Sequence, residues 1–430
     1  MLVRTKRPLL HRFQGRYTEV VSQVLRSQSM DRMMRMLETE IEKIPHNFLR
    51  FTLTSKLAEK GIKDKTTIDA IVEHILSGGD GEHEWDDGSE EEVIIEFTDQ
   101  DSEETHKKMN DFLEESLPKI IQKSIDDCVN NSLRSYRQTA EKTLHKVRNE
   151  AKGFESRTFK RWKSAFDHLE MMWHIAQELG EAHSKDFDSK NLEDTHIVMA
   201  AISEIFPKAL IVTREIICLL KGGYPDGALA RWRSLHELTV SAMYILEEGK
   251  EPALNYMLSV HFSARRAAHQ LNEHAERARM EPFSDEMLRT FDSHCAEAEK
   301  QLDRKIDRDK NGEWPAINLA HRNYADMERH VGMEHWRPRY KWASRHTHAD
   351  FVPNDKLLGM SETKNHITLV GASNSGFADP LMMTAISLAQ ITNTYLSVTP
   401  NFDRTVHSRV ILELSNEMND IAIKTRDDTL

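Results

Sequence analysis

Hydrophobic residues recur three and four positions apart along most of the 430-residue chain. This period places them on one face of an α-helix, whereas a half-buried strand would alternate strictly between apolar and polar positions. The 17 Gly and 12 Pro residues are too few for a fold built from many hairpins. The pattern therefore predicts an all-α protein: a helical bundle with an N-terminal helical region and an acidic linker.

The expected helices follow from where the apolar period starts and stops. They cover residues 17–42, 66–76, 107–151, 159–181, 194–221, 226–248, 252–278, 284–307, 320–332, a short piece near Tyr340, 379–397 and 404–424. Four regions result: an N-terminal helical region (1–78), an acidic linker (79–105), an amphipathic helical arm (106–158) and a helical-bundle domain (159–430).

The acidic linker changes the charge picture. Residues 79–105 hold thirteen acids and no Lys or Arg, whereas the whole chain has a net charge of −12, so the remainder is close to neutral. Like charges in close sequence repel, which favours a loop, with one short strand from Val93 to Phe97. A nearly neutral remainder excludes a globally basic nucleic-acid binder, although a local basic site is still compatible with it. On the arm, basic residues interleave with acids, which favours a solvated surface helix.

Cysteine usage and the length of the apolar runs indicate the cellular compartment that we expect for the protein. Cys128, Cys218 and Cys295 are far apart and form no CxxC pair, which argues against a disulfide framework and a cysteine zinc site. A reducing, cytoplasmic setting is expected, with no cofactor. No run approaches 18 apolar residues, so no membrane contact is expected. The basic first eighteen residues are expected to lead into a helix and not to act as a transit peptide.

The richest chemistry lies in residues 211–248, where a Gly-Gly-Tyr-Pro-Asp-Gly turn joins two apolar helices into an antiparallel hairpin. The second helix enters the core carrying Arg231, Arg233, His236 and Glu237. Arg233 and Glu237 are four residues apart and can pair on one helical face. Charges in such a place are tolerated only when they are paired. The simplest interpretation is an intrahelical ion pair beside a satisfied core histidine.

A second polar cluster lies in residues 335–350, HWRPRYKWASRHTHAD. If residues 340–349 are helical, Ser344 and His348 lie one turn apart on one face. That face could meet Arg233 and Glu237. In this arrangement Glu237 would orient His348 and raise its basicity, while an arginine would hold an anion.

Three chemical interpretations compete for these two clusters. Alternating His346, His348 and Asp350 could face a divalent metal ion, but no HExxH motif accompanies them. Arg231 with His236 fits R-x4-H, and Arg339 with His346 fits R-x6-H, the spacings of HEPN-type ribonucleases, although about five such matches are expected by chance in this composition. The third interpretation has no chemistry: the clusters would fix helix register in a scaffold used for partner contact.

Two stretches resemble a bacterial family, the domain of unknown function 5677. They are ALARWRSLHELTVSAMYIL (228–246) and YKWASRHTHAD (340–350), and the resemblance extends over about residues 194–397. By matching, Arg233, Glu237, Ser344 and His348 occupy the polar positions of that family. The resemblance implies a helical, HEPN-like layout, which some toxins and phage-defence nucleases share. In HEPN enzymes the Arg and His belong to one motif, whereas here His348 lies on another helix.

Two functional hypotheses follow. The first is a HEPN-like, metal-independent ribonuclease or defence toxin that acts on RNA. Its catalytic residues would be Arg231, Arg233, His236, Glu237, Ser344 and His348. The alternative is a noncatalytic interaction or regulatory scaffold, with a protein partner at the N-terminal region or a second copy in a homodimer. The ribonuclease hypothesis predicts that His236 or His348 faces a solvent-reachable cleft beside an arginine; the scaffold hypothesis predicts that internal pairs consume these groups.

Overall fold

The computed structural model describes residues 2–4, 43–77, 82–84, 93–95, 98–186, 193–308, 313–348, 350–362 and 368–428. Its fold is all-α apart from one small sheet, as the apolar period predicts. The chain divides into two compact units, Met1–Leu144 and His145–Leu430, whereas the sequence suggested a main domain starting at residue 159. The expected helix 17–42 lies outside the described residues.

In the first unit, helices α3 (Ile44–Glu59) and α4 (Lys65–Leu76) pack into a small core with Ile95. The sequence missed α3, whose first turn contains Pro45; a proline is tolerated there because first-turn N–H groups have no helical partner. The strands are β1 (Leu2–Arg4), β2 (Glu82–Glu84) and β3 (Val93–Ile94). They are ordered β2-β1-β3, with β1 antiparallel to β2 and parallel to β3.

The acidic tract 79–105 was expected to be a loop with one short strand over residues 93–97. Strand β3 lies within that range, whereas β2 and the start of α5 (Asp99–Asp111) stand where a loop was expected. Thr98 and Asp101 form a capping box, because each side chain accepts a hydrogen bond from the other residue's backbone N–H. Acidic side chains are also favoured at a helix N-terminus by the helix dipole. These local interactions outweigh charge repulsion at this end of the tract.

The arm and the following segment form two helices that meet at a kink at Trp162 and together make up α6 (Leu117–Asp186). A single π-helical turn (Phe112–Ser116) links α5 to α6. The sequence predicted two helices here, 107–151 and 159–181. Gly153 does not interrupt α6, since a lone glycine costs a helix only about 1 kcal/mol relative to alanine; instead the helix kinks at Trp162, which has φ −97° and ψ 15°.

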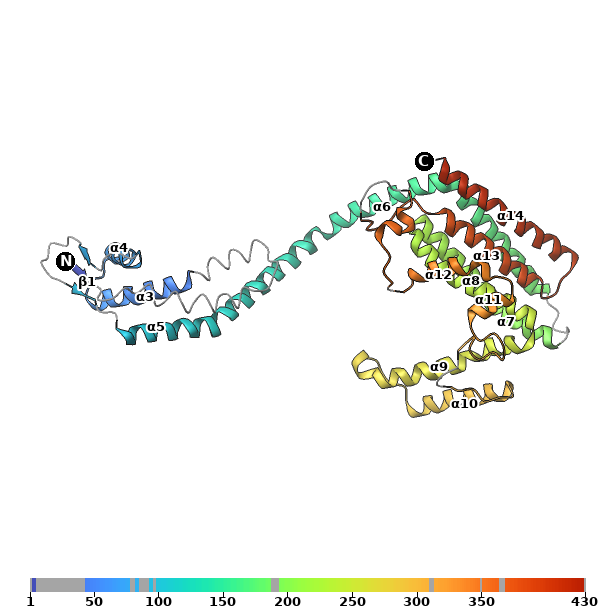
Figure 1. Ribbon diagram of the computed structural model, residues 1–430, viewed down its shortest axis with the longest axis horizontal. Coiled ribbons are helices and arrows are strands. Elements are labelled where there is room, and N and C mark those ends of the chain that lie inside the picture. Colours follow the sequence, from blue (N-terminus) through green and yellow to red (C-terminus); the bar gives the residue numbers. More distant parts are fainter. Residues whose placement is uncertain are drawn as a thin grey trace. The chain divides into compact units, whose positions relative to one another are not determined.

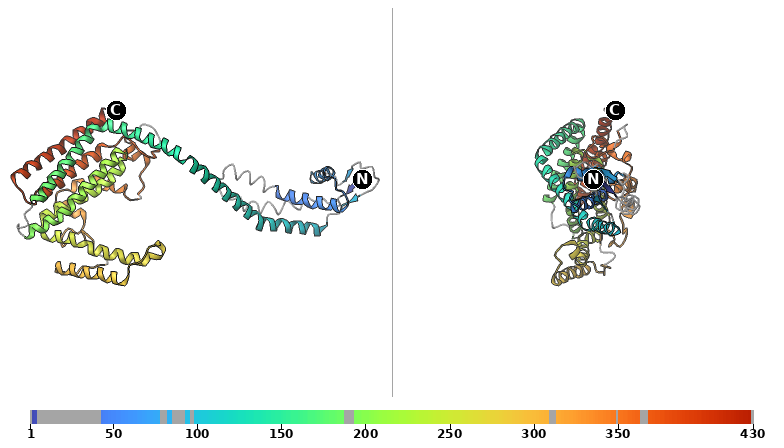
Figure 2. Two further views of the ribbon diagram at one scale, coloured as in Figure 1. Left: turned by 180° about the vertical axis from the view of Figure 1, so that it is seen from behind. Right: turned by 90° about the vertical axis from the view of Figure 1, so that its left-hand side faces the viewer.

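The second unit is built from helices. They are α7 (Glu193–Lys221), α8 (Pro225–Glu248), α9 (Lys250–Ala278), α10 (Asp285–Gln301), α11 (Tyr324–His330), α12 (Arg337–Arg345), α13 (Ala378–Leu396) and α14 (Phe402–Asp427), with 3-10 turns at Glu334–Trp336, Asn354–Lys356 and Leu358–Met360. In Figures 1 and 2, α7, α8, α13 and α14 run side by side, and α9 and α10 form a hairpin at one end of them. This bundle contains both polar clusters found in the sequence.

The bundle core forms where α7, α8 and α13 meet. Trp232 of α8 is buried, and its indole N–H lies 3.0 Å from both Met383 O and Ser387 Oγ of α13. By length and composition, residues Asp194–Lys221 of α7 could cross a membrane. However, α7 packs on α8, α9 and α13, so it is a core helix of the bundle.

Two of the expected helices are shorter than predicted. Helix α10 ends at Gln301 instead of 307, because Asp303 takes a positive φ of 50° that turns the chain. Helix α11 begins at Tyr324 instead of 320, after Asn323 caps it by accepting from Asp326 N. Helix α12 ends at Arg345, so the condition that residues 340–349 be helical is met only in part.

Candidate functional site: a polar centre between α8, α11 and α12

The turn before α8 fixes where its polar residues enter the core. Gly223 has φ +85°, a conformation that favours glycine, and Pro225 occupies the first turn of the helix. Asp226 then accepts hydrogen bonds from the backbone N–H groups of Leu358 (2.8 Å) and Gly359 (3.1 Å). The start of α8 is thereby tied to the segment between α12 and α13.

One half of the polar centre joins α8 to α12. Arg233 and Glu237 form the i, i+4 ion pair that the sequence predicts, with Nη2 to Oε1 at 2.9 Å. Glu237 also accepts a hydrogen bond from the Tyr340 hydroxyl of α12. Burial, followed by this bond to a carboxylate, raises the pKa of Tyr340 to about 12. Tyr340 therefore stays protonated at neutral pH and acts as a hydrogen-bond donor.

The other half joins α8 to α11. His236 Nε2 lies 3.0 Å from Oε1 of Glu328, and both side chains are only 1% exposed. Because a carboxylate can only accept, His236 donates through Nε2; its Nδ1 is buried with no hydrogen-bond partner among the described residues. Arg337, the first residue of α12, donates to Oε2 of Glu328 at 3.0 Å. Glu328 thus holds a histidine and an arginine from two different helices.

Tyr340 links the two halves. The guanidinium groups of Arg233 and Arg337 lie 4.9 and 4.8 Å from the centroid of its ring, within cation–π range. The ring of His236 is 5.8 Å away. We call this connected set the polar centre, and its members are Arg233, His236, Glu237, Glu328, Arg337 and Tyr340.

Three of the six residues predicted for the site do not join this centre. Arg231 pairs with Glu215 of α7 and lies 3.3 Å from Ser234 Oγ. Ser344 donates its hydroxyl back to Tyr340 O at 2.9 Å, within α12. His348 is exposed in the turn after α12, and its side chain forms no hydrogen bond or ion pair with described residues. The expected pairing of His348 with Glu237 is not present; the tyrosine one turn before Ser344 takes the place beside Glu237.

Sequence reasoning missed Glu328 and Arg337. Glu328 lies beside Met327 on α11, one turn from Tyr324 and Val331, so it falls on the buried apolar face of that short helix. A carboxylate at such a position is a signal that a cationic partner will be needed. The identity of that partner could not be read, because His236 is 92 residues away in sequence.

A surface pocket of about 330 Å³ lies beside the polar centre. Its lining residues are Lys208, Ile211, Val212, Arg231, Ser234, Glu237, Leu238, Ser241, Tyr256 and Tyr324. Burial, and secondarily the charge of Glu237, raises the pKa of Tyr324; burial and the charge of Glu204 raise that of Tyr256. No histidine lines this pocket, so it offers hydroxyl donors and cations but no imidazole for proton transfer.

The structure also shows where the R-x6-H residues and the possible metal ligands lie. His346 Nδ1 is 3.7 Å from Asp226, and Arg339 pairs with Asp379 at 3.2 Å, so the R-x6-H residues point to different partners. Among the described residues, no group of three or more His, Cys, Asp or Glu side chains is arranged to hold a metal ion. The alternation of His346, His348 and Asp350 therefore does not assemble a ligand set there.

The fold and site thus define an all-α protein with a charged cluster enclosed between three helices. Residues 199–366 match the model of a family of unknown function (DUF5677), which confirms for that segment the resemblance drawn from the sequence. The match spans α8, α11 and α12, and so contains the whole polar centre. No curated protein and no solved structure matches the chain.

Proposed function

We propose that this chain is a noncatalytic interaction protein, in which the polar centre fixes the register of α8, α11 and α12. The observation that carries the proposal is the pairing of His236 with Glu328, each 1% exposed. A histidine that moves a proton must come within hydrogen-bond reach of its substrate. His236 has neither solvent access nor a place in the neighbouring pocket.

The energetics of the centre support a structural role. An isolated buried charge costs several kcal/mol, and a buried ion pair offsets that cost only when further hydrogen bonds satisfy it. Glu328 meets this condition with one bond from His236 and one from Arg337. Because these partners come from different helices, sliding α11 or α12 along α8 by one turn would leave charges unpaired. Such a cluster specifies one packing of the bundle.

The arm supports the interaction part of the proposal. Large apolar side chains on α6, among them Val129 and Tyr136, are at least half exposed. Soluble proteins seldom maintain a continuous exposed apolar row unless it meets a partner. A bundle of fixed shape that carries such an arm is suited to holding partners together.

A HEPN-like ribonuclease or defence toxin is the second candidate. One observation favours it: Arg231, the arginine of R-x4-H, lines the open pocket, where it could stabilise charge on a phosphate. Its histidine, however, would have to leave Glu328 and reach the pocket before it could act.

An RNA cleavage assay separates the two candidates. Full-length protein is incubated with labelled RNA in EDTA, beside His236→Ala and the matched surface variant His348→Ala. The proposal expects intact RNA in all three reactions. Cleavage by the unmodified protein that leaves 2′,3′-cyclic phosphate ends, and that His236→Ala abolishes, would overturn the noncatalytic proposal and establish the ribonuclease.

A further inference from the structure

Helix α6 carries a regular apolar row within the first unit. We call it the apolar stripe, and its members are Ile125, Val129, Leu133, Tyr136, Ala140 and Leu144. Their spacing is four, four, three, four and four residues, so each of the first three positions recurs eleven residues later. Eleven residues make three turns at 3.67 residues per turn, close to the 3.6 of a straight helix. The stripe therefore runs nearly parallel to the helix axis and does not wind around it.

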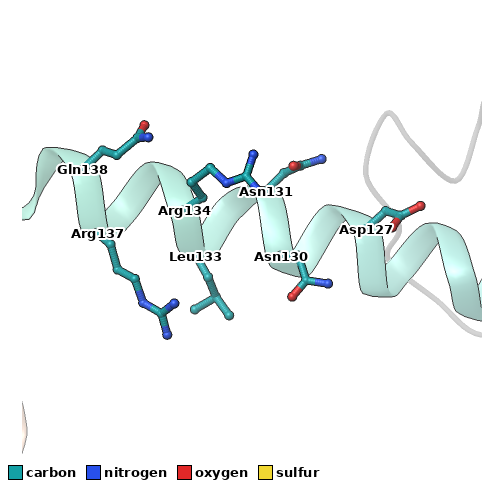
Figure 3. Close-up of a pocket in the computed structure, with 7 residues that line it drawn as sticks. All are labelled: Asp127, Asn130, Asn131, Leu133, Arg134, Arg137 and Gln138. Atoms are coloured by element: carbon teal, nitrogen blue, oxygen red, sulfur yellow. The ribbon is translucent and has the colours of Figure 1, made fainter.

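Five of the six stripe residues are exposed, and Ala140 is half-buried. Leu133 is 42% exposed and Tyr136 72%, with Ile125, Val129 and Leu144 between these values. None of the six belongs to the core of the first unit. In Figure 3, Leu133 projects to the same side of α6 as Arg137 and Asn130, while Asp127, Asn131, Arg134 and Gln138 project away from it. Leu133 thus lies on a different face of α6 from Gln138, and residues 122–139 are exposed on every side of the helix.

We propose that the stripe pairs with the stripe of a second copy of this chain, the two helices running antiparallel. This inference rests on the proposed interaction role and names its partner. The first reason is symmetry: the six positions read the same from either end about the midpoint between Arg134 and Ser135. Antiparallel pairing therefore brings all six into layers, with Ile125 opposite Leu144, Val129 opposite Ala140, and Leu133 opposite Tyr136.

Side-chain size favours antiparallel over parallel pairing. In a parallel pair each residue faces itself, so two Tyr136 rings would crowd one layer and two Ala140 methyl groups would leave a gap in the next. Overfilled and underfilled layers each cost a packed interface 1 kcal/mol or more, as a rough guide. Antiparallel layers set the tyrosine against a leucine and the alanine against a valine, which evens out the volumes.

The first test is the mass of the full-length protein in solution, measured by light scattering across micromolar concentrations. The expected result is a dimer. Leu133→Glu places a charge in the central layer and should shift the protein to monomer mass, while Gln138→Glu adds the same charge on the opposite face and should leave the dimer intact. Circular dichroism checks that both variants remain helical. A monomer at every concentration, or a dimer unaffected by Leu133→Glu, would overturn the inference.

Cysteines placed on the stripe itself report the direction of pairing. In the antiparallel pair the two copies of position 125 would be offset by nineteen residues, about 28 Å along the axis, and each would face position 144 of the other copy. The tests use a Cys128→Ser, Cys218→Ser background, because both of these thiols are exposed and Cys295 is buried.

Under copper phenanthroline and oxygen, Ile125→Cys alone should form no covalent dimer, whereas Ile125→Cys combined with Leu144→Cys should form one through positions 125 and 144. Efficient crosslinking through Ile125→Cys alone would show parallel pairing and overturn the inference. A monomeric protein would overturn the dimer and leave the RNA assay unaffected, so the two proposals fail separately.

Discussion

The polar centre of the second unit and the apolar stripe of the first unit differ in which kind of side chain is buried and which is exposed. In the polar centre, polar side chains such as Glu328 and His236 are enclosed and each has a partner. On the stripe, apolar side chains such as Leu133 and Tyr136 are exposed and have no cover. A buried charge must find its partners within the chain, because water cannot reach it. An exposed apolar row can instead be buried by another molecule. The polar centre therefore belongs to the internal architecture of the bundle, and the stripe is the surface for which we propose a partner.

The largest loss of stability is expected from a substitution that disrupts the polar centre. Glu328→Ala leaves His236 and Arg337 without their shared carboxylate, and removing one member of a buried ionic group costs about 3–5 kcal/mol. Six of the seven tryptophans follow residue 145, so denaturation followed by tryptophan fluorescence reports mainly on the second unit. Glu334→Ala, an exposed position in the 3-10 turn just before α12, is the control and should change stability little. Equal effects from both substitutions would show that Glu328 is not held as described.

A smaller loss should follow from Tyr340→Phe. The substitution removes the hydroxyl that donates to Glu237 but keeps the ring beside Arg233 and Arg337. A hydrogen bond to a charged group contributes about 1.5–3 kcal/mol, so the free energy of unfolding should fall by that amount. Tyr136→Phe on the stripe is the matched control and should be neutral. An unchanged stability in Tyr340→Phe would mean that the hydroxyl bond adds nothing.

The pH dependence of stability should show a third effect, at Glu299 of α10. Its carboxylate accepts hydrogen bonds from Arg308 and Lys305, and the Arg308 bond is the main reason its pKa falls from 4.5 to about 2. The native state therefore holds Glu299 ionised where the unfolded chain would protonate it. The resulting stability is complete above pH 4.5 and is lost as the pH falls toward 2.

Glu299→Gln should remove that component, on the order of 1 kcal/mol because the exposed Lys305 is screened by solvent. The measurement is the difference in unfolding free energy between wild type and variant at pH 5.5 and at pH 3. The difference should shrink at the lower pH. A constant difference would mean that the ionisation of Glu299 is not coupled to folding.

The smallest effect is expected on the stripe itself. Val129→Ser changes an exposed side chain of the first unit, so the tryptophan-detected unfolding of the second unit should shift by less than about 0.5 kcal/mol. A shift this small would show that the stripe does not contribute to the stability of the bundle core. A shift comparable with that of Tyr340→Phe would indicate that Val129 contributes to the stability of the bundle, and the contrast between the two regions would no longer hold.

The sequence was sufficient for the long helices and insufficient for the site. Helices α7, α8 and α9 lie within two residues of their predicted bounds, because a sustained apolar period and the Gly223–Pro225 turn are local signals. The Arg233–Glu237 pair was predicted for the same reason: it depends only on spacing along one helix.

What could not be predicted depends on contacts between distant segments. Glu328 and His236 are paired across 92 residues, and nothing in either local pattern names the other. The expected role of His348 required α12 to continue to residue 349, but the helix ends at Arg345. Tyr340 then occupies the place beside Glu237 that the sequence had given to a histidine.

A double-mutant cycle on His236 and Glu328 tests the structural role of the polar centre most directly. The unfolding free energies of wild type, His236→Ala, Glu328→Ala and the double variant give the coupling between the two side chains. If they are a buried pair that fixes helix register, the coupling should be about 1.5–3 kcal/mol. A coupling near zero would show that the two residues do not stabilise the bundle together and would contradict the account.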